Sequence, residues 1–453
     1  MRRALRMMIN ACVATSLVVL AGATESQAAD RPGGSVDVPD SPITLALRAD
    51  AVAAYQAIEA LSAAERTGYS SLMVDPEARD VKIYWKGQRP DRLARDLQRR
   101  GLGNRVLIKQ APFNRTELLA AVKQAIRPGE ATLFVGGRRI AETSRVVAAN
   151  PDNDGAGISV TVDEAALPET ERRITAASVD GTVRLGATEI PATITAGPVP
   201  VTADLRGDTP RRGGAFIRVP GTTSTTNAAT CTAGFVVINS AGARRMMTAA
   251  HCARKGQQVS YSGGSRFGQV ETSNSGTDVA MYDNSATTNA FQGVVATGGA
   301  YNNTNGQTLY TDDVATGPGI KGADTVIPNT LGWVSGALSG EQGYGTINSV
   351  DVCINYSGWQ EVCGLYRLRQ DAKLGPLAGE GDSGGPVFWR VGGGTSSGKV
   401  WAQGVVSGIE GGTTGECPNN GWRGTRKCSA FIYVAPMGKA MDTLGARGLV
   451  ITG

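Results

Sequence analysis

Apolar residues in the first quarter of the chain recur at two different spacings. Residues 45–65 carry them three and four positions apart, which predicts a helix. The runs at 80–85 and 104–111 are short and rich in β-branched and aromatic residues, which predicts strands. Residues 90–101, with Pro near the start and Gly at the end, and 114–127, which open with an Asn-Arg-Thr-Glu capping sequence, predict two more helices. The pattern is typical of a small α+β block.

The pattern changes beyond this block. From residue 131 to about 205 the apolar residues form short runs between Gly-containing turns, which predicts strands. Residues 206–212 are polar, contain Gly and Pro, and end in Arg211 and Arg212, so we expect a linker and processing zone there. Everything later consists of short strand-like runs and Gly/Ser/Thr/Asn turns, up to one expected helix within 435–448. The sequence therefore predicts an all-β domain behind an α+β region.

The first 28 residues have a different composition. Arg2, Arg3 and Arg6 precede an apolar stretch over about 7–23, and small residues stand before a cut after Ala28. This order is that of a secretory signal peptide, so we expect a secreted, extracellular protein. A transmembrane anchor is the alternative, but the stretch is short and contains Asn10. We therefore expect no membrane association after the signal has been removed.

Cysteine usage agrees with export. Apart from Cys12 in the expected signal, the chain has six cysteines, all beyond residue 230. An even number in an exported chain predicts disulfides, although six cysteines allow about 15 pairings. No pair has Cys-x-x-Cys spacing and the chain has a single histidine, so a zinc site is not expected.

Charge excludes one class of partner. The 453 residues have a formal net charge of +5, and the basic residues are scattered without a stripe or interleaved aromatics. Nucleic acid is therefore not an expected partner. We expect neither a cofactor nor a metal ion.

Two short motifs carry the candidate chemistry. The only histidine, His251, lies in the sequence TAAHC, and Ser383 lies in GEGDSGGPVFW, where four glycines surround it. A lone histidine is usually a packed or surface residue. A tight Gly-rich turn, however, lets backbone N–H groups converge beside a serine hydroxyl, which is the geometry of a nucleophile with an oxyanion hole. Serine needs an adjacent base at neutral pH, and His251 is the one histidine that could serve.

These motifs resemble those of the chymotrypsin-fold, trypsin-like serine proteases of the S1 type. The resemblance covers about residues 213–453, and it is closest to the secreted bacterial streptogrisin and alpha-lytic branch, since the segment DVCINYSGWQEVCG (351–364) is similar to a disulfide loop there and a long N-terminal pro-region is typical. It implies a double six-stranded β-barrel with a C-terminal helix. It also implies a hydrolase that cleaves proteins or peptides through an acyl-enzyme.

The resemblance implies a role for each site residue. His251 is the base and Ser383 the nucleophile, while Asp278, 27 residues after His251 and at the start of an apolar run, completes the catalytic triad. Asp283 is the alternative carboxylate. The N–H groups of Gly381 and Ser383 are expected to form the oxyanion hole.

Asp382 is expected to be structural, but its family partners are missing. In animal relatives it pairs with a new N-terminus, and in some bacterial relatives with a buried Arg, whose position here looks like Ile354. We expect Arg367 or Arg369 to take the place of that buried arginine beside Asp382.

The resemblance also implies three disulfides. The expected pairs are Cys231–Cys252, Cys353–Cys363 and Cys417–Cys428. The last pair departs from the family pattern, because the family cysteine before the serine motif corresponds here to Gly379.

Four residues are expected to bind substrate. Leu377 corresponds to the base of the specificity pocket in relatives, and Ser407, Gly408 and Ile409 resemble the strand that pairs with the substrate backbone. An apolar pocket base predicts cleavage after apolar or small residues.

The expected organisation is therefore that of a zymogen. It has a signal peptide (1–28), an α+β pro-region (29–205), a linker (206–212) and a protease domain (213–453). The pro-region is interpreted as an intramolecular chaperone and inhibitor, because folds with many non-local contacts form slowly. An independent binding domain retained in the mature protein is the alternative. Two other readings of the whole chain remain, a non-catalytic binding or regulatory protein on a protease scaffold and a periplasmic chaperone-protease.

Overall fold

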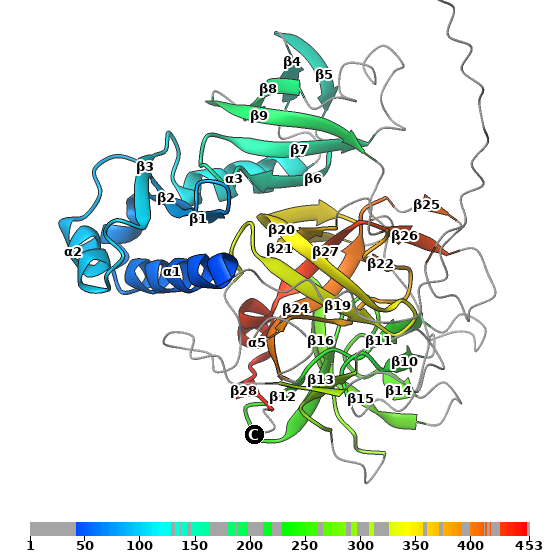
Figure 1. Ribbon diagram of the computed structural model, residues 1–453. Helices are drawn as coiled ribbons and strands as arrows, with labels where there is room; N and C mark the ends of the chain where they lie inside the picture. The colour runs from blue at the N-terminus through cyan, green and yellow to red at the C-terminus, as the bar shows by residue number, and fades with distance from the viewer. Residues whose placement is uncertain are drawn as a thin grey trace, which may run out of the picture. The chain divides into compact units, whose positions relative to one another are not determined.

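The computed structural model of the chain is built mostly from β-strands (Figure 1). Its described residues are 42–127, 132–135, 137–142, 146–163, 179–185, 188–197, 212–219, 229–260, 266–286, 291–296, 308–311, 326–356, 360–370, 375–390, 399–411, 413–414, 417 and 426–450. The expected signal peptide, Arg211 and most of the expected linker lie outside them. Among the described residues, none of the helices combines the length and the apolar character needed to cross a membrane.

The N-terminal α+β block forms as its pattern predicts. Strand β1 pairs antiparallel with β2, and β2 pairs parallel with β3, so the three strands make one sheet. Helices α1 and α2 share a buried apolar core with this sheet. The bounds are α1 Pro42–Glu59, η1 Glu65–Gly68, β1 Tyr69–Asp75, β2 Asp80–Trp85, α2 Asp91–Arg99, β3 Val106–Gln110 and α3 Arg115–Ile126. The capping box of α3 is confirmed, since Asn114 and Glu117 each accept a backbone N–H of the other at 2.9 Å.

Six strands follow in the order β6-β7-β9-β8-β4-β5. Apolar side chains of β4, β6, β7, β8 and β9 pack with α3 into a second buried core. The bounds are β4 Thr132–Val135, β5 Arg138–Glu142, β6 Val146–Pro151, β7 Ile158–Asp163, β8 Val179–Leu185 and β9 Thr188–Gly197. Strand β6 also pairs antiparallel with strand β20 of the C-terminal half, which places Ala148 opposite Ile354 and Ala149 opposite Cys353.

The C-terminal half begins with a sheet in the order β11-β10-β14-β15-β16-β13-β12-β28. Strand β28, the last in the part of the chain that the structure describes, therefore pairs with β12, far earlier in the sequence. The bounds are β10 Phe216–Val219, β11 Ala229–Thr232, β12 Val236–Ile238, β13 Arg244–Thr248, β14 Gln258–Ser260, β15 Arg266–Asn274, β16 Val279–Tyr282 and β28 Gly448–Leu449.

A second group of strands in this half closes on itself. The hydrogen-bonded circuit runs β19-β20-β21-β27-β24-β23 and returns to β19, which gives it a barrel-like curl. The bounds of these six strands and of the remaining elements of this half are β17 Val294–Ala296, β18 Thr308–Thr311, β19 Leu331–Gly336, β20 Gly340–Asn355, β21 Glu361–Arg369, β22 Ala378–Gly379, β23 Pro386–Arg390, β24 Lys399–Ile409, β25 Thr413–Thr414, β26 Lys427–Ser429, β27 Phe431–Pro436 and α5 Met437–Leu444.

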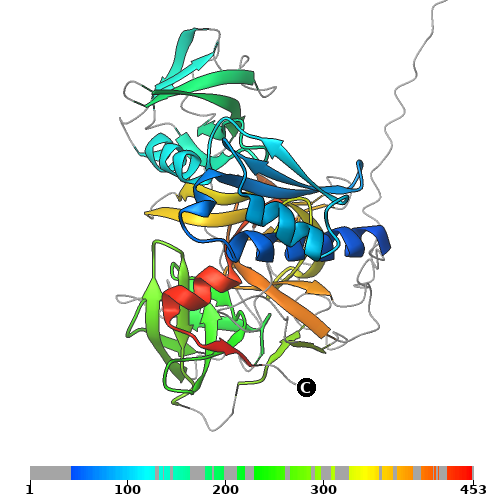
Figure 2. The ribbon, with the colours of Figure 1, turned by 90° about the vertical axis from the view of Figure 1, so that its left-hand side faces the viewer.

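One apolar core joins the two groups of strands. It contains Met247 and Met281 from the first group, Phe388 and Trp389 from the second, and Met441 from α5. Figure 2 shows α5, in red, beside the green strands of the first group, and α5 also contacts β24 and β27. This core brings the chain after β13, the chain before β16 and the turn before β23 to one place, and these three segments carry the candidate site.

Candidate active site

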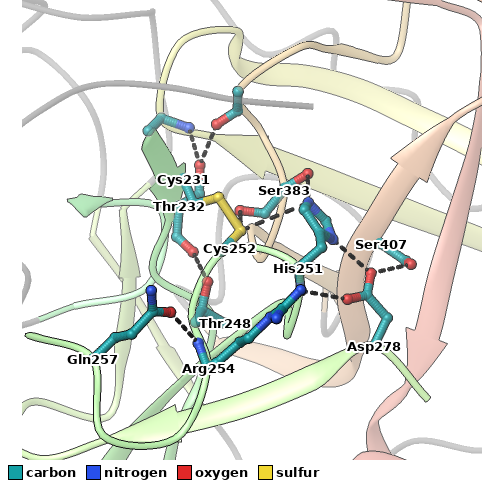
Figure 3. The surroundings of a disulfide bond; sticks show 12 residues. Cys231, Thr232, Thr248, His251, Cys252, Arg254, Gln257, Asp278, Ser383 and Ser407 are labelled. Carbon is teal, nitrogen blue, oxygen red and sulfur yellow. Dashed lines mark hydrogen bonds and ion pairs between the residues drawn. A yellow bond between two sulfur atoms is a disulfide. The ribbon is translucent and has the colours of Figure 1, made fainter. Parts of the chain in front are cut away.

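His251 lies just after β13 and makes hydrogen bonds in two directions. Its Nδ1 lies 2.8 Å from Oδ2 of Asp278, and its Nε2 lies 2.9 Å from Oγ of Ser383. Figure 3 shows the imidazole between these two residues. The histidine side chain is 5% exposed and the aspartate side chain is fully buried. A carboxylate on Nδ1 favours the tautomer in which Nε2 accepts a proton from a hydroxyl, so this arrangement can activate a serine.

Asp278 is held firmly in place. Its carboxylate also accepts the backbone N–H of His251 at 2.9 Å and the hydroxyl of Ser407 at 2.5 Å. Its φ is +53°, a left-handed conformation that Asp adopts more readily than most residues and that often marks a functional site. The buried carboxylate can therefore orient the imidazole and stabilise its protonated form.

Asp283, the alternative carboxylate, has other partners. It accepts the backbone N–H of Gln269 at 2.8 Å and both the N–H and the hydroxyl of Ser285. Burial by itself would raise the pKa of Asp283, but these hydrogen bonds hold that pKa below its usual value. Asp283 thus supports a turn, while Asp278 contacts His251.

Ser383 lies in the Gly-rich turn between β22 and β23. Gly381 has φ +114° and Gly384 has φ +83°, conformations that side chains disfavour. A Cβ on Gly384 would lie closer than 3.0 Å to backbone atoms of Thr232 and Ala249. The glycines therefore let this turn press against the segment that carries His251.

Thr232 ties the turn to the first group of strands. Its N–H donates to the carbonyl of Ser383 at 2.7 Å, and its hydroxyl donates to the carbonyl of Gly381 at 2.9 Å. The disulfide between Cys231 and Cys252 joins the neighbour of Thr232 to the neighbour of His251 (Figure 3). His251 and Ser383 are thus held by one covalently linked frame.

The proposed oxyanion donors belong to the same turn. The N–H of Asp382 donates to Gly379 and that of Gly384 to Val406. Within the described residues, the N–H of Gly381 has no hydrogen-bond acceptor, so it can serve a developing negative charge.

The side chain of Asp382 points away from this N–H into the protein. Its carboxylate accepts backbone N–H groups of Leu338, Ser339 and Gly379 at 3.2, 3.1 and 2.8 Å. It also accepts the Ser339 hydroxyl at 2.5 Å and Nη2 of Arg426 at 2.8 Å. The carboxylate is fully buried, and these donors take the place of the water that it has lost.

The expected partner of Asp382 was wrong. Arg367 instead pairs with Glu410, its Nε lying 2.6 Å from Oε2, and Ile354 lies in the β20–β21 ladder opposite Val362. The cation beside Asp382 is Arg426, whose side chain is 3% exposed. Arg426 stands 44 residues beyond Asp382 in no recognisable motif, and its only sequence signal is its place two residues before Cys428.

Of the four expected substrate-binding residues, two lie near Asp278 and two lie in a buried apolar cluster. Leu377 and Ile409 are both fully buried and share this cluster with Ile432. Ser407 contacts Asp278, and Gly408 follows it on β24.

Tyr356 was missed by the sequence analysis. Its hydroxyl donates to Oγ of Ser407 at 2.8 Å, and its ring centroid lies 6.3 Å from that of His251. A Cβ on Gly408 would collide with the tyrosine ring, so this glycine admits the tyrosine. Burial and then the charge of Asp278 raise the pKa of Tyr356 well above its usual value, which keeps its hydroxyl a donor. Its place inside the Cys353–Cys363 loop was the only hint in the sequence.

The other two disulfides join Cys353 to Cys363 and Cys417 to Cys428. In the described residues, the two places where three potential metal ligands converge each contain a disulfide, Cys231–Cys252 with His251 and Cys353–Cys363 with Glu361. Disulfide sulfurs are not thiolates, so neither place offers a metal its usual ligands.

No protein-family model matches the sequence, and no curated protein matches it. Solved structures do match part of it. Nocardiopsis protease is 24% identical, with 52% of this chain and 97% of that chain covered and a TM-score of 0.35. Thermobifida fusca protease A is 23% identical, with coverages of 53% and 98% and a TM-score of 0.35. A glutamic acid specific serine protease is 23% identical, with coverages of 52% and 97% and a TM-score of 0.34.

Proposed function

We propose that the chain is a secreted serine endopeptidase made as a precursor. The supporting observation is the unbroken series of hydrogen bonds from Ser407 through Asp278 and His251 to Ser383. In this proposal the expected pair of six-stranded barrels carries the site, and the closed circuit of β19-β20-β21-β27-β24-β23 supports the second barrel.

The proposed reaction has two halves. Ser383 Oγ attacks the carbonyl carbon of the scissile peptide bond while Nε2 of His251 takes its proton, and the new oxyanion accepts N–H groups of Gly381 and Ser383. The amine then leaves with the proton from His251, which leaves an acyl-enzyme. Water then attacks the acyl carbonyl carbon and gives a proton to His251. The acid product leaves, and Ser383 regains its proton from His251. Asp278 stabilises the imidazolium throughout.

A fluorophosphonate probe tests the nucleophile. We expect the processed protein to be labelled at Ser383, and the label to disappear in Ser383→Ala and His251→Ala. Ser260→Ala is the matched control, because Ser260 is a buried serine on β14, and this variant should label normally. A folded, processed protein that does not label would favour the binding-scaffold alternative.

Cleavage after apolar or small residues is the proposed specificity. It rests on the apolar character of Leu377, which corresponds to the base of the specificity pocket in relatives and offers no charge to pair with Arg, Lys or Glu. In a peptide library that varies the residue immediately before the cleaved bond, kcat/KM should be highest for apolar or small residues. Strict cleavage after Arg, Lys or Glu would exclude this specificity.

The N-terminal region is proposed to act as an inhibitor and folding aid. It extends the sheet of the C-terminal half through the β6–β20 pairing, and Arg115 forms an ion pair with Asp351. The buried guanidinium of Arg48 lies 4.4 Å from the ring centroid of Trp389 and 5.1 Å from that of Trp401. Such stacked, desolvated cations contribute strongly to interfaces.

Expression in parts tests this role. Residues 206–453 alone should yield little active enzyme, and supplying 29–205 separately should restore folding and then inhibit the product. A 29–205 fragment with Arg48→Ala should restore less. If 206–453 alone folds and cleaves protein readily, the folding role is wrong. Sequencing the mature N-terminus distinguishes a removed pro-region from a retained binding domain.

A further inference from the structure

Arg426 lies immediately before β26, the central strand of the small β22-β26-β25 sheet. This sheet pairs Cys428 with Gly379, four residues before Ser383. The Cys417–Cys428 disulfide anchors the same strand. Arg426 therefore precedes a strand that a disulfide anchors and that pairs with residues 378–379, just before the Ser383 turn.

The guanidinium of Arg426 contacts this turn twice. Nη2 donates to Oδ2 of Asp382 at 2.8 Å, and Nε donates to the backbone carbonyl of Glu380. Nη2 also donates to the hydroxyl of Ser339 at 2.9 Å, and that hydroxyl donates to Asp382. One rigid group thus holds the residues on both sides of Gly381.

The contact with Glu380 determines where the next N–H points. The peptide bond between Glu380 and Gly381 is trans, and in a planar trans peptide the C=O and N–H point in opposite directions. Because Arg426 holds the carbonyl, the Gly381 N–H must point away from Arg426. Among the described residues it has no acceptor there. Thr232 holds the following carbonyl, that of Gly381, so rotation of the turn is restrained from both sides.

We propose that Arg426 is a positioning residue, which aims the oxyanion-hole N–H of Gly381 by holding the Glu380 carbonyl and the Asp382 carboxylate together. This inference rests on the proposed protease function.

Two glycines make room for this arrangement. A Cβ on Gly336 would lie closer than 3.0 Å to the carboxylate of Asp382, and a Cβ on Gly379 would lie equally close to the sulfur of Cys428. An arginine fork can bond a carboxylate and a carbonyl at once from fixed directions, whereas a lysine ammonium is a single point donor on a flexible stem. Lysine at this position would therefore keep the charge but lose one of the two contacts.

The test is Arg426→Lys in the enzyme matured from the full chain. We expect kcat/KM to fall by about 10²–10³-fold, the effect of losing one oxyanion donor, mostly through kcat. A peptide trifluoromethyl ketone, which forms a tetrahedral oxyanion with Ser383, should lose affinity by a similar factor. A cleaved product peptide, which forms no oxyanion, should bind nearly as before. The acid limb of the kcat/KM profile should not move, because the contacts of His251 with Asp278 are untouched.

Arg390→Lys is the matched control. Arg390 forms an ion pair with Glu341, and the two side chains are 3% and 2% exposed, about as buried as Arg426 and Asp382. In the part of the chain that the structure describes, the Arg390 side chain bonds Glu341 and not the Ser383 turn. This variant should keep kcat within about twofold, as a structural ion pair away from the reacting atoms should. If Arg426→Lys does not fold, Arg426→Gln combined with Asp382→Asn removes both buried charges and should show the same losses.

The outcomes separate the two proposals. If the unaltered enzyme hydrolyses peptides and the Arg426 variants keep full activity, the positioning role is wrong. Equal losses for substrate, ketone and product peptide would also overturn it, because they would indicate general disorder of the cleft. If the unaltered, folded enzyme neither hydrolyses peptides nor labels at Ser383, the protease function itself is wrong.

Discussion

Replacing Gly384 by alanine would disturb the turn of Ser383 in two separable ways. The residue has φ +83°, which costs an L-amino acid about 1–2 kcal/mol. Its new Cβ would also lie closer than 3.0 Å to the backbone of Thr232 and Ala249. Overpacking of this kind costs about 1–3 kcal/mol, so the total expected loss is about 2–5 kcal/mol.

Gly375→Ala isolates the conformational part of this loss. Gly375 has a similar φ of +85°, but a Cβ there would have no neighbour within 4 Å. We therefore expect a loss of only about 1–2 kcal/mol at this position.

Thermal unfolding of both variants, in a Ser383→Ala background that prevents self-cleavage, measures the difference. At about 2–4 °C per kcal/mol, Gly384→Ala should melt several degrees below Gly375→Ala. In the active background, Gly384→Ala should also react slowly with the fluorophosphonate probe, while Gly375→Ala should react normally. Equal melting temperatures and normal labelling of both variants would refute the idea that close backbone approach shapes the nucleophile turn.

Three further predictions follow from particular contacts. Tyr356→Phe removes the hydrogen bond to Ser407 and should lower kcat about 2- to 10-fold, as a net loss of about 0.5–1.5 kcal/mol implies, without loss of fold; unchanged steady-state kinetics would contradict this. Replacing Cys417 and Cys428 together by serine should lower kcat in the same manner as Arg426→Lys, because the strand carrying that arginine loses its brace; unaltered turnover would show that the small sheet suffices. Burial raises the pKa of Asp152 to about 6, so its contribution to stability is fully present below about pH 4 and is lost as the pH rises through 6. Asp152→Asn should therefore raise the melting temperature of the full chain at pH 8 and leave it nearly unchanged at pH 4, and a loss of stability at pH 8 would contradict the assignment.

The sequence by itself determined most of the local structure. The helix over residues 115–126 begins with the capping box that its sequence predicts, and the apolar run after Asp278 forms strand β16. These features depend on residues close together in the chain, where spacing and capping act directly. The motifs around His251 and Ser383 likewise contain the glycine and cysteine neighbours that their local geometry needs.

Only the tertiary structure decided which distant residues support the site. It brought Arg426 to Asp382, where our substitute from the sequence was Arg367 or Arg369, and it placed Tyr356 against Ser407. It also paired β6 with β20, which joins the N-terminal region to the hairpin that carries Tyr356. A buried ion pair or a strand pairing depends on which surfaces the cores bring together, and any buried cation of suitable reach satisfies a buried carboxylate. The spacing of residues in the sequence does not predict these partners, because they meet only after the strands between them have packed.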